Sequence, residues 1–280
     1  MKSLAVRVLV PALSLLLAGP VAAQGKSTKA FKYKGGRVDV GTMHVYDRSD
    51  LAGTKSGETI VYVPSKTKLE IVFMGPGTDL VRDLVAEMDW DTYSLKSFEL
   101  YTERKGGART LSASGTATDE ALSLTVQDPA LAAGGAVPVT VSIRLPHVPT
   151  HIYPFGLLTL SHAMRHLAER DKEFQVGLLG EDPKGPAWLS ALGTVTVSFI
   201  EEVDRDGIPC NKYKLEGPAF GSEVGFLWIE KDKGYLQDVE VAVPPGLGWP
   251  DLKMTYKSSE KVSESSWESR RAEEIARFLK

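Results

Sequence analysis

The fold class is decided by residues 194–216, which read TVTVSFIEEVDRDGIPCNKYKLE. Val195, Val197 and Phe199 alternate with polar residues, which is the pattern of a strand with one buried face. Residues 204–207, DRDG, then place a glycine where a tight turn needs a positive φ angle. A second strand-like run follows at once. The two strands are therefore antiparallel neighbours, because a parallel crossover needs a dozen or more residues.

The same alternation continues on both sides of this hairpin. Short breaks separate five runs, which form a meander: 192–203, 209–216, 223–230, 235–243 and 251–257. The preceding half has a similar rhythm, and its longest clean example is residues 137–145. About a dozen strands are expected in all. The predicted fold is mainly β: a curved antiparallel sheet, or unclosed β-barrel, covered by a few helices.

Three helices are expected among these strands. The first spans residues 78–89, with Thr78 as its N-cap. The second follows Pro154 and ends near Asp171. The third lies at the carboxyl end, where Ser265 and Glu268 form a capping box and an apolar side is expected to dock on the sheet. The apolar positions of the last two helices are Leu157, Leu160, Met164 and Leu167, and Trp267, Ile275, Phe278 and Leu279.

Residues 1–23 have the three parts of a secretory signal peptide. Lys2 and Arg7 precede an apolar stretch, and small residues end it at Ala23. The stretch is shorter than the roughly 20 apolar residues of a membrane span, so an uncleaved anchor is the less favoured alternative. We expect export to a bacterial periplasm, with residues 24–280 forming a single β half-barrel domain that ends in a helix. No later segment reaches transmembrane length.

Composition excludes several classes of function. The 33 Lys and Arg residues are outnumbered by 36 Asp and Glu residues, and the resulting net charge of −3 argues against nucleic acid as a partner. A single cysteine, Cys210, cannot close an intrachain disulfide or supply a four-thiolate zinc site. Because a lone cysteine is most often enclosed by the core, we expect Cys210 to be buried.

A histidine pair provides the strongest hint of metal chemistry. His162 and His166 share one face of the second predicted helix with Glu169, at a spacing that could bind zinc. That face lies opposite the apolar stripe of the helix, so a solvated polar face is the favoured interpretation. His147 and His151, in a loop before the helix, could add ligands. We expect no catalytic residue, no metal site and no cofactor.

An excess of large apolar side chains on the strands points instead to ligand binding. Residues 226–229, FLWI, offer apolar groups to both faces of one strand. The concave face of a curved sheet can line a groove for an acyl chain or another apolar ligand. A filled core is the competing interpretation at each position. The candidate ligand-binding residues are Phe199, Tyr213, Phe226, Trp228, Met254 and Tyr256.

Short motifs in the second half resemble an exported bacterial family of poorly characterised function. They are residues 207–215 (GIPCNKYKL), 224–231 (VGFLWIEK) and 234–236 (GYL), with residues 148–150 (VPT) before a helix. That family is similar to the periplasmic lipoprotein carriers of the LolA/LolB type. The resemblance implies an unclosed antiparallel barrel whose concave face is covered by helices and holds acyl chains.

These observations together predict a periplasmic, non-enzymatic binding or carrier protein for a lipid or other apolar ligand. One alternative is an envelope assembly factor that acts through protein–protein contacts of an edge strand and the last helix. A metal-dependent hydrolase that uses the histidines is the less favoured alternative.

Overall fold

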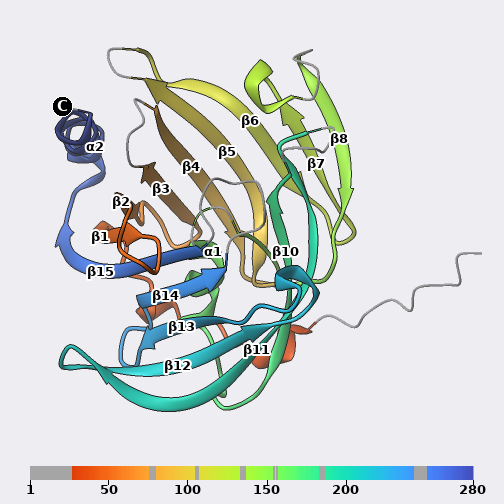
Figure 1. Cartoon of the computed structure of the whole chain (residues 1–280), viewed down its shortest axis with the longest axis vertical. Helices are drawn as coiled ribbons and strands as arrows, with labels where there is room; N and C mark the ends of the chain where they lie inside the picture. The colour runs from red at the N-terminus through yellow and green to blue at the C-terminus, as the bar shows by residue number, and fades with distance from the viewer. Residues whose placement is uncertain are drawn as a thin grey trace, which may run out of the picture.

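Fifteen strands form one sheet in the residues that the computed structural model describes, namely 27–75, 80–104, 107–132, 137–153, 155, 157–182, 187–242 and 251–279 (Figure 1). The strands are β1 (Thr42–Ser49), β2 (Ser56–Tyr62), β3 (Lys68–Met74), β4 (Leu80–Asp89), β5 (Ser94–Arg104), β6 (Thr110–Ala117), β7 (Ala121–Val126), β8 (Val139–Arg144), β9 (Thr150–Ile152), β10 (Phe174–Glu181), β11 (Leu189–Arg205), β12 (Ile208–Glu216), β13 (Gly225–Glu230), β14 (Leu236–Ala242) and β15 (Asp251–Lys261). The helices are α1 (Leu158–Met164) and α2 (Glu264–Phe278), and single 3-10 turns are η1 (Ser27–Ala30), η2 (Gly35–Arg37), η3 (Pro129–Leu131) and η5 (Pro218–Phe220).

The sheet consists of two meanders joined at their first and last strands. The order across it is β8-β7-β6-β5-β4-β3-β2-β1-β15-β14-β13-β12-β11-β10-β9, and every pair is antiparallel except β9 with β10. The strands curve around a concave side, and no ladder joins the two edge strands, β8 and β9, among the described residues (Figure 1). The predicted fold class, a curved and unclosed antiparallel sheet with few helices, is confirmed.

The hairpin that decided the prediction is formed as expected. Arg205 pairs with Ile208, so the loop between β11 and β12 has two residues, Asp206 and Gly207. Their φ angles are +55° and +82°, as a type I′ turn requires at both central positions. The side chain of Asp204 accepts a hydrogen bond from the Gly207 amide at 2.7 Å, which fixes the turn further.

The sheet buries apolar side chains on both faces near its middle. On β2, Val61 faces the main core, whereas Ile60 and Tyr62 face the opposite side. Helix α2 covers that outer side, and Trp267 of α2 stacks on Tyr62 with 4.4 Å between ring centroids. The prediction that the last helix docks on the sheet is confirmed. Its capping box is not: Ser263 is the N-cap residue, and its side chain makes no cap hydrogen bond.

A buried charge cluster also fastens α2 to the outer face. Asp83 of β4 is 1% exposed and lies 2.6 Å from Arg109 and 3.6 Å from Arg271 of α2. Glu70 of β3 lies 3.7 Å from each of the two guanidinium groups. Burial, together with the neighbouring Glu70 charge, raises the pKa of Asp83 to about 7.

Helix α1 fills part of the concave side of the sheet. All seven of its residues are buried, and it contacts β5, β9, β13 and β14. The main core joins its apolar residues to those of both meanders. This part of the concave face is therefore packed with the protein's own side chains and does not form the open groove expected from the sequence. None of the helices in the described part of the chain is long and apolar enough to cross a membrane.

Two helix predictions are corrected by the structure. The segment predicted as a helix over residues 78–89 is strand β4, which pairs with β3 and β5; Thr78 lies outside the described residues. Leu84, Ala86 and Met88 are buried in the main core, so pairing and core burial override the helical spacing read from the sequence. The second predicted helix is shorter than expected, because α1 spans only Leu158–Met164.

Candidate functional site

The six predicted ligand-binding residues do not line one surface. Tyr213 and Met254 are buried in the main core, and Phe199 and Tyr256 pack against it. These four residues belong to the inner face of the sheet. Burial raises the pKa of the Tyr213 phenol above its ordinary range.

Phe226 and Trp228 lie on the outer face instead. In the register of β12 and β13, Lys212 pairs with Trp228, whereas Tyr213 pairs with Leu227 on the inner side. The Lys212 ammonium lies 5.0 Å from the centre of the Phe226 ring, and the Arg205 guanidinium lies 4.4 Å from that of Trp228. Trp228 is buried beneath these cations, so only Phe226 keeps an open apolar side.

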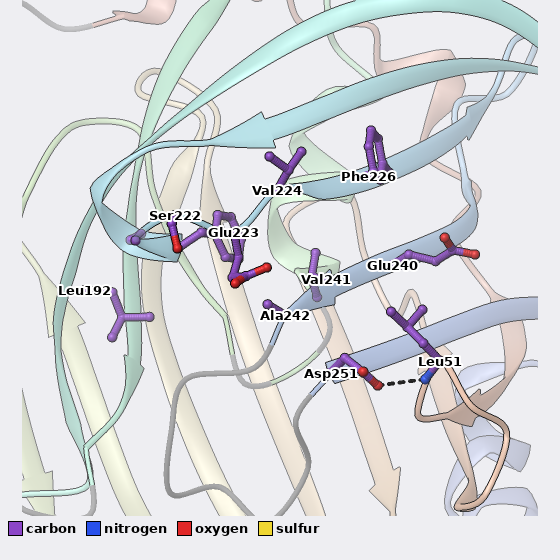
Figure 2. A pocket seen from close by; sticks show the side chains of 13 residues that line it. Leu51, Leu192, Ser222, Glu223, Val224, Phe226, Glu240, Val241, Ala242 and Asp251 are labelled. Carbon is purple, nitrogen blue, oxygen red and sulfur yellow. Dashed lines mark hydrogen bonds between the residues drawn. The ribbon is translucent and has the colours of Figure 1, made fainter.

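Phe226 belongs to a cavity of about 700 Å³ at one end of β13 and β14, which we call the η5 groove (Figure 2). Its walls come from the β1–β2 turn, β11, η5 with the residues after it, β13, β14 and the start of β15. The lining residues are Leu51, Leu192, Ala219, Phe220, Gly221, Ser222, Glu223, Val224, Phe226, Glu240, Val241, Ala242 and Asp251.

Two local features hold the walls of this groove in place. Gly217 precedes η5 with a φ angle of +136°, and a Cβ atom there would lie 2.8 Å from the Thr194 carbonyl oxygen. Only glycine therefore allows η5 to approach β11 so closely. On the opposite wall, Asp251 accepts a hydrogen bond of 2.7 Å from the Leu51 amide, and this bond joins the β1–β2 turn to β15 (Figure 2).

Exposed apolar side chains and acidic groups together give the groove its chemistry. Leu51 and Val224 are 51% and 41% exposed, although both are large and apolar. The described lining residues include Glu223, Glu240 and Asp251 but no lysine, arginine or histidine. Glu240 lies 3.6 Å from Lys253, whereas Glu223 has no ion pair with a described residue. An apolar wall with an acidic rim suits an amphipathic molecule without a negative head group.

The polar face predicted for the second helix is wrong, because His162 of α1 and His166, just after α1, are both buried. The ring of His166 lies 4.5 Å from that of Trp90 and accepts a hydrogen bond of 2.9 Å from the Lys34 amide. Burial lowers the pKa of His166 to about 4 and that of His162 well below its ordinary value. Glu169 does not join them; it is exposed and pairs with Lys172.

The other histidines proposed as metal ligands are enclosed as well. His147 and His151 are buried, and their ring nitrogens have no hydrogen-bond partner in the described part of the chain. Within the described residues, no group of three or more His, Cys, Asp and Glu side chains is arranged to hold a metal ion. Cys210 is buried, as predicted, and burial raises its pKa to about 11.

Neither a protein-family model nor a curated protein matches this sequence. The resemblance to the lipoprotein carriers therefore stays a prediction.

Most of the groove could not be found from the sequence. Phe226 was predicted, but Leu51, Leu192, Phe220 and Val224 were not, because they come from segments that are far apart in the chain. The available signal was weak: Phe220 and Val224 are apolar residues within a stretch rich in turn-forming residues. Whether such residues pack inward or stay exposed depends on tertiary contacts.

Proposed function

We propose that this protein is a non-enzymatic binding protein that holds the apolar part of an amphipathic small molecule in the η5 groove. The observation that carries the proposal is the combination of exposed Leu51 and Val224 with a cavity of about 700 Å³. Ligand pockets commonly have volumes of roughly 300–1,000 Å³ and predominantly apolar walls. A hydrocarbon chain is the simplest group that fits these walls.

The acidic rim supports a particular class of head group. Glu240 is paired with Lys253 and Arg205, but Glu223 and Asp251 form no ion pair with a described residue, so a carboxylate or phosphate head beside those two would meet uncompensated negative charge. A cationic head is favoured by the same charges, and a neutral head is tolerated. The proposed ligand is thus a cationic or neutral amphiphile with an acyl or alkyl chain.

The expected export signal supports a periplasmic site of action. Residues 1–23 lie outside the described residues, so this part of the proposal depends on their basic, apolar and small-residue pattern. An exported protein with an apolar groove can bind a hydrocarbon chain in an aqueous compartment, where each buried methylene contributes about 0.8 kcal/mol.

Calorimetric titration with single-chain detergents below their micelle-forming concentrations tests the proposal. Dodecyltrimethylammonium is expected to bind, and dodecyl sulfate is expected to bind on the order of tenfold more weakly because of the acidic rim. Val224→Asn removes apolar wall from the groove and should weaken binding of the cationic probe about tenfold.

A matched control distinguishes binding in the η5 groove from nonspecific binding to exposed apolar side chains elsewhere. Ile200 on β11 is 42% exposed, close to the 41% of Val224, but it does not line the groove. Ile200→Asn should leave binding unchanged. Equal losses in the two variants, or no measurable binding of the cationic probe to the unaltered protein, would refute the proposed function.

A further inference from the structure

A second cavity, of about 500 Å³, lies where β1 begins and β15 ends, and we call it the β1–β15 pocket. Its walls come from residues 36–39, the start of β1, the turn between β13 and β14, and the end of β15. Met43 and Val45 of β1 belong to the outer cluster beneath α2. Thr42 and His44 alternate with them, so these two side chains face the other side of the sheet, where the pocket lies.

A carboxylate in this pocket is held in place by two hydrogen bonds. Asp39 accepts from Arg165 through Oδ1, and its Oδ2 lies 2.6 Å from Nε2 of His44. Burial alone would raise the pKa of Asp39, but the bond from His44 and the charge of Arg165 hold it well below its ordinary value. An ionised carboxylate has about four acceptor positions, so about two remain for a ligand. The side chain of Asp39 is 22% exposed and lines the pocket.

Two buried polar side chains that line the pocket have unsatisfied atoms. Thr42 and His44 are 7% and 3% exposed, and neither the Thr42 hydroxyl nor Nδ1 of His44 has a hydrogen-bond partner in the described part of the chain. Burial lowers the pKa of His44, so its ring is neutral, and Nδ1 is an acceptor while Nε2 donates to Asp39. Because buried polar groups are normally hydrogen-bonded, these side chains favour a polar ligand over a hydrocarbon chain.

Aromatic rings form one wall of the pocket. The rings of Tyr235 and Tyr256 have centroids 5.0 Å apart, and they lie 5.8 and 6.3 Å from the ring of His44. Both tyrosines are half-buried, so part of each ring stays open to the pocket. The Tyr256 phenol donates a hydrogen bond of 2.9 Å to the Ser259 hydroxyl. This wall therefore combines flat apolar surface with hydroxyl groups, unlike the aliphatic wall of the η5 groove.

The charges of the described lining residues balance. Three basic side chains meet three acidic ones: Arg37, Lys233 and Lys261, and Asp39, Asp232 and Glu260. The Lys261 ammonium donates one hydrogen bond, of 2.9 Å, to the Val40 carbonyl, and an ammonium has three donors. The pocket thus offers acceptors on Asp39 and donors on Lys261 without a net charge. Hydroxyl groups suit this combination, because each one both donates and accepts.

We propose that the β1–β15 pocket binds a small neutral saccharide. A sugar ring has a face of C–H groups that packs on Tyr235 or Tyr256, and a rim of hydroxyls that hydrogen-bond to Asp39 and Lys261. A hydrocarbon chain satisfies none of these polar groups, and an ionic ligand gains no net attraction from balanced charges. None of the described residues lines both this pocket and the η5 groove, so the proposal is independent of amphiphile binding.

Saturation-transfer difference NMR of the full chain with maltose, cellobiose and N,N′-diacetylchitobiose tests the proposal, and titration gives the affinities. At least one of these sugars should bind, with the strongest transfer to the C–H protons of one ring face. Tyr235→Leu removes the stacking surface and should weaken binding on the order of fivefold. Tyr235→Phe keeps the ring and should bind like the unaltered protein.

A second pair of variants leaves the aromatic wall intact. Lys261→Met removes a charged hydrogen-bond donor and should weaken binding about tenfold. Lys257→Met is the matched control, because Lys257 is also exposed on β15 but does not line the pocket. Val224→Asn, in the η5 groove, should leave sugar binding unchanged. Absence of transfer to all three sugars at about 10 mM, or equal losses in the two lysine variants, would overturn the proposal.

Discussion

Replacement of His151 by leucine is expected to remove a large, pH-dependent loss of stability. His151 lies on β9, is fully buried, and has no hydrogen-bond partner for either ring nitrogen in the described part of the chain. Burial therefore lowers its pKa from 6.5 to about 3. Between about pH 3 and pH 6.5, the unfolded chain therefore binds a proton at His151 that the folded chain does not bind.

The size of the effect follows from this difference in proton binding. A pKa that is lower in the folded state leaves stability intact above pH 6.5 and reduces it as the pH falls. Each pH unit below 6.5 costs about 1.4 kcal/mol, so His151 should lower the free energy of unfolding by roughly 3 kcal/mol at pH 4.5. Leucine has a similar volume and no charge, and it should abolish this term.

Urea unfolding of the unaltered protein and of His151→Leu at pH 7.5 and pH 4.5 measures the effect. The stability of the variant relative to the unaltered protein should rise by roughly 3 kcal/mol between the two conditions. Thr150→Val is a matched control, because Thr150 is buried beside His151 on β9 and does not titrate. Its effect should be the same at both values of pH.

A stability of His151→Leu, relative to the unaltered protein, that does not change with pH would contradict this prediction. Such a result would mean that His151 binds a proton in the folded protein as readily as in the unfolded chain. The burial of His151 on β9 would then be wrong.

Two further predictions concern the outer face and the groove. Asp83 has a raised folded-state pKa of about 7, so it contributes stability while protonated and loses it as the pH rises from about 4 to 7. The stability of Asp83→Asn relative to the unaltered protein should thus rise on the order of 2 kcal/mol from pH 5 to 8.5 in urea unfolding, and a fall would contradict the buried cluster. Gly217→Ala forces a Cβ atom to within 2.8 Å of the Thr194 carbonyl oxygen at a φ of +136°, which should cost about 1–3 kcal/mol. It should also weaken binding of dodecyltrimethylammonium; unchanged melting temperature and binding would show that η5 does not need the close approach.

The sheet could be predicted where the period of two is regular, as in residues 194–216. It was missed at β4, where Leu80, Val81, Leu84 and Val85 also fit a helical spacing. Local pattern cannot separate these alternatives, because the apolar spacing within β4 fits both, and β4 becomes a strand through its pairing with β3 and β5. Chain-local signals therefore predict strands with a regular period of two better than strands whose apolar residues also fit a helical spacing.

The candidate site was harder to predict for the same reason. The polar residues of the second predicted helix were expected to face water, but His162 of α1 and His166, just after α1, are buried against the Trp90 ring. Phe226 and Trp228 share one face of β13, yet cations cover Trp228 whereas Phe226 borders the groove. The environments of Phe226 and Trp228 differ because the side chains around them come from other strands.

Alternation, turn residues and composition act over a few neighbouring residues, so they were enough to predict the class of the fold, the β11–β12 turn and the burial of Cys210. They did not predict that α1 fills the concave side, that α2 docks on the outer face or that the η5 groove stays open. These outcomes depend on which segments, distant in the chain, come into contact when the sheet curves. The free energy of burying side chains in those contacts outweighs the local conformational preference of each segment.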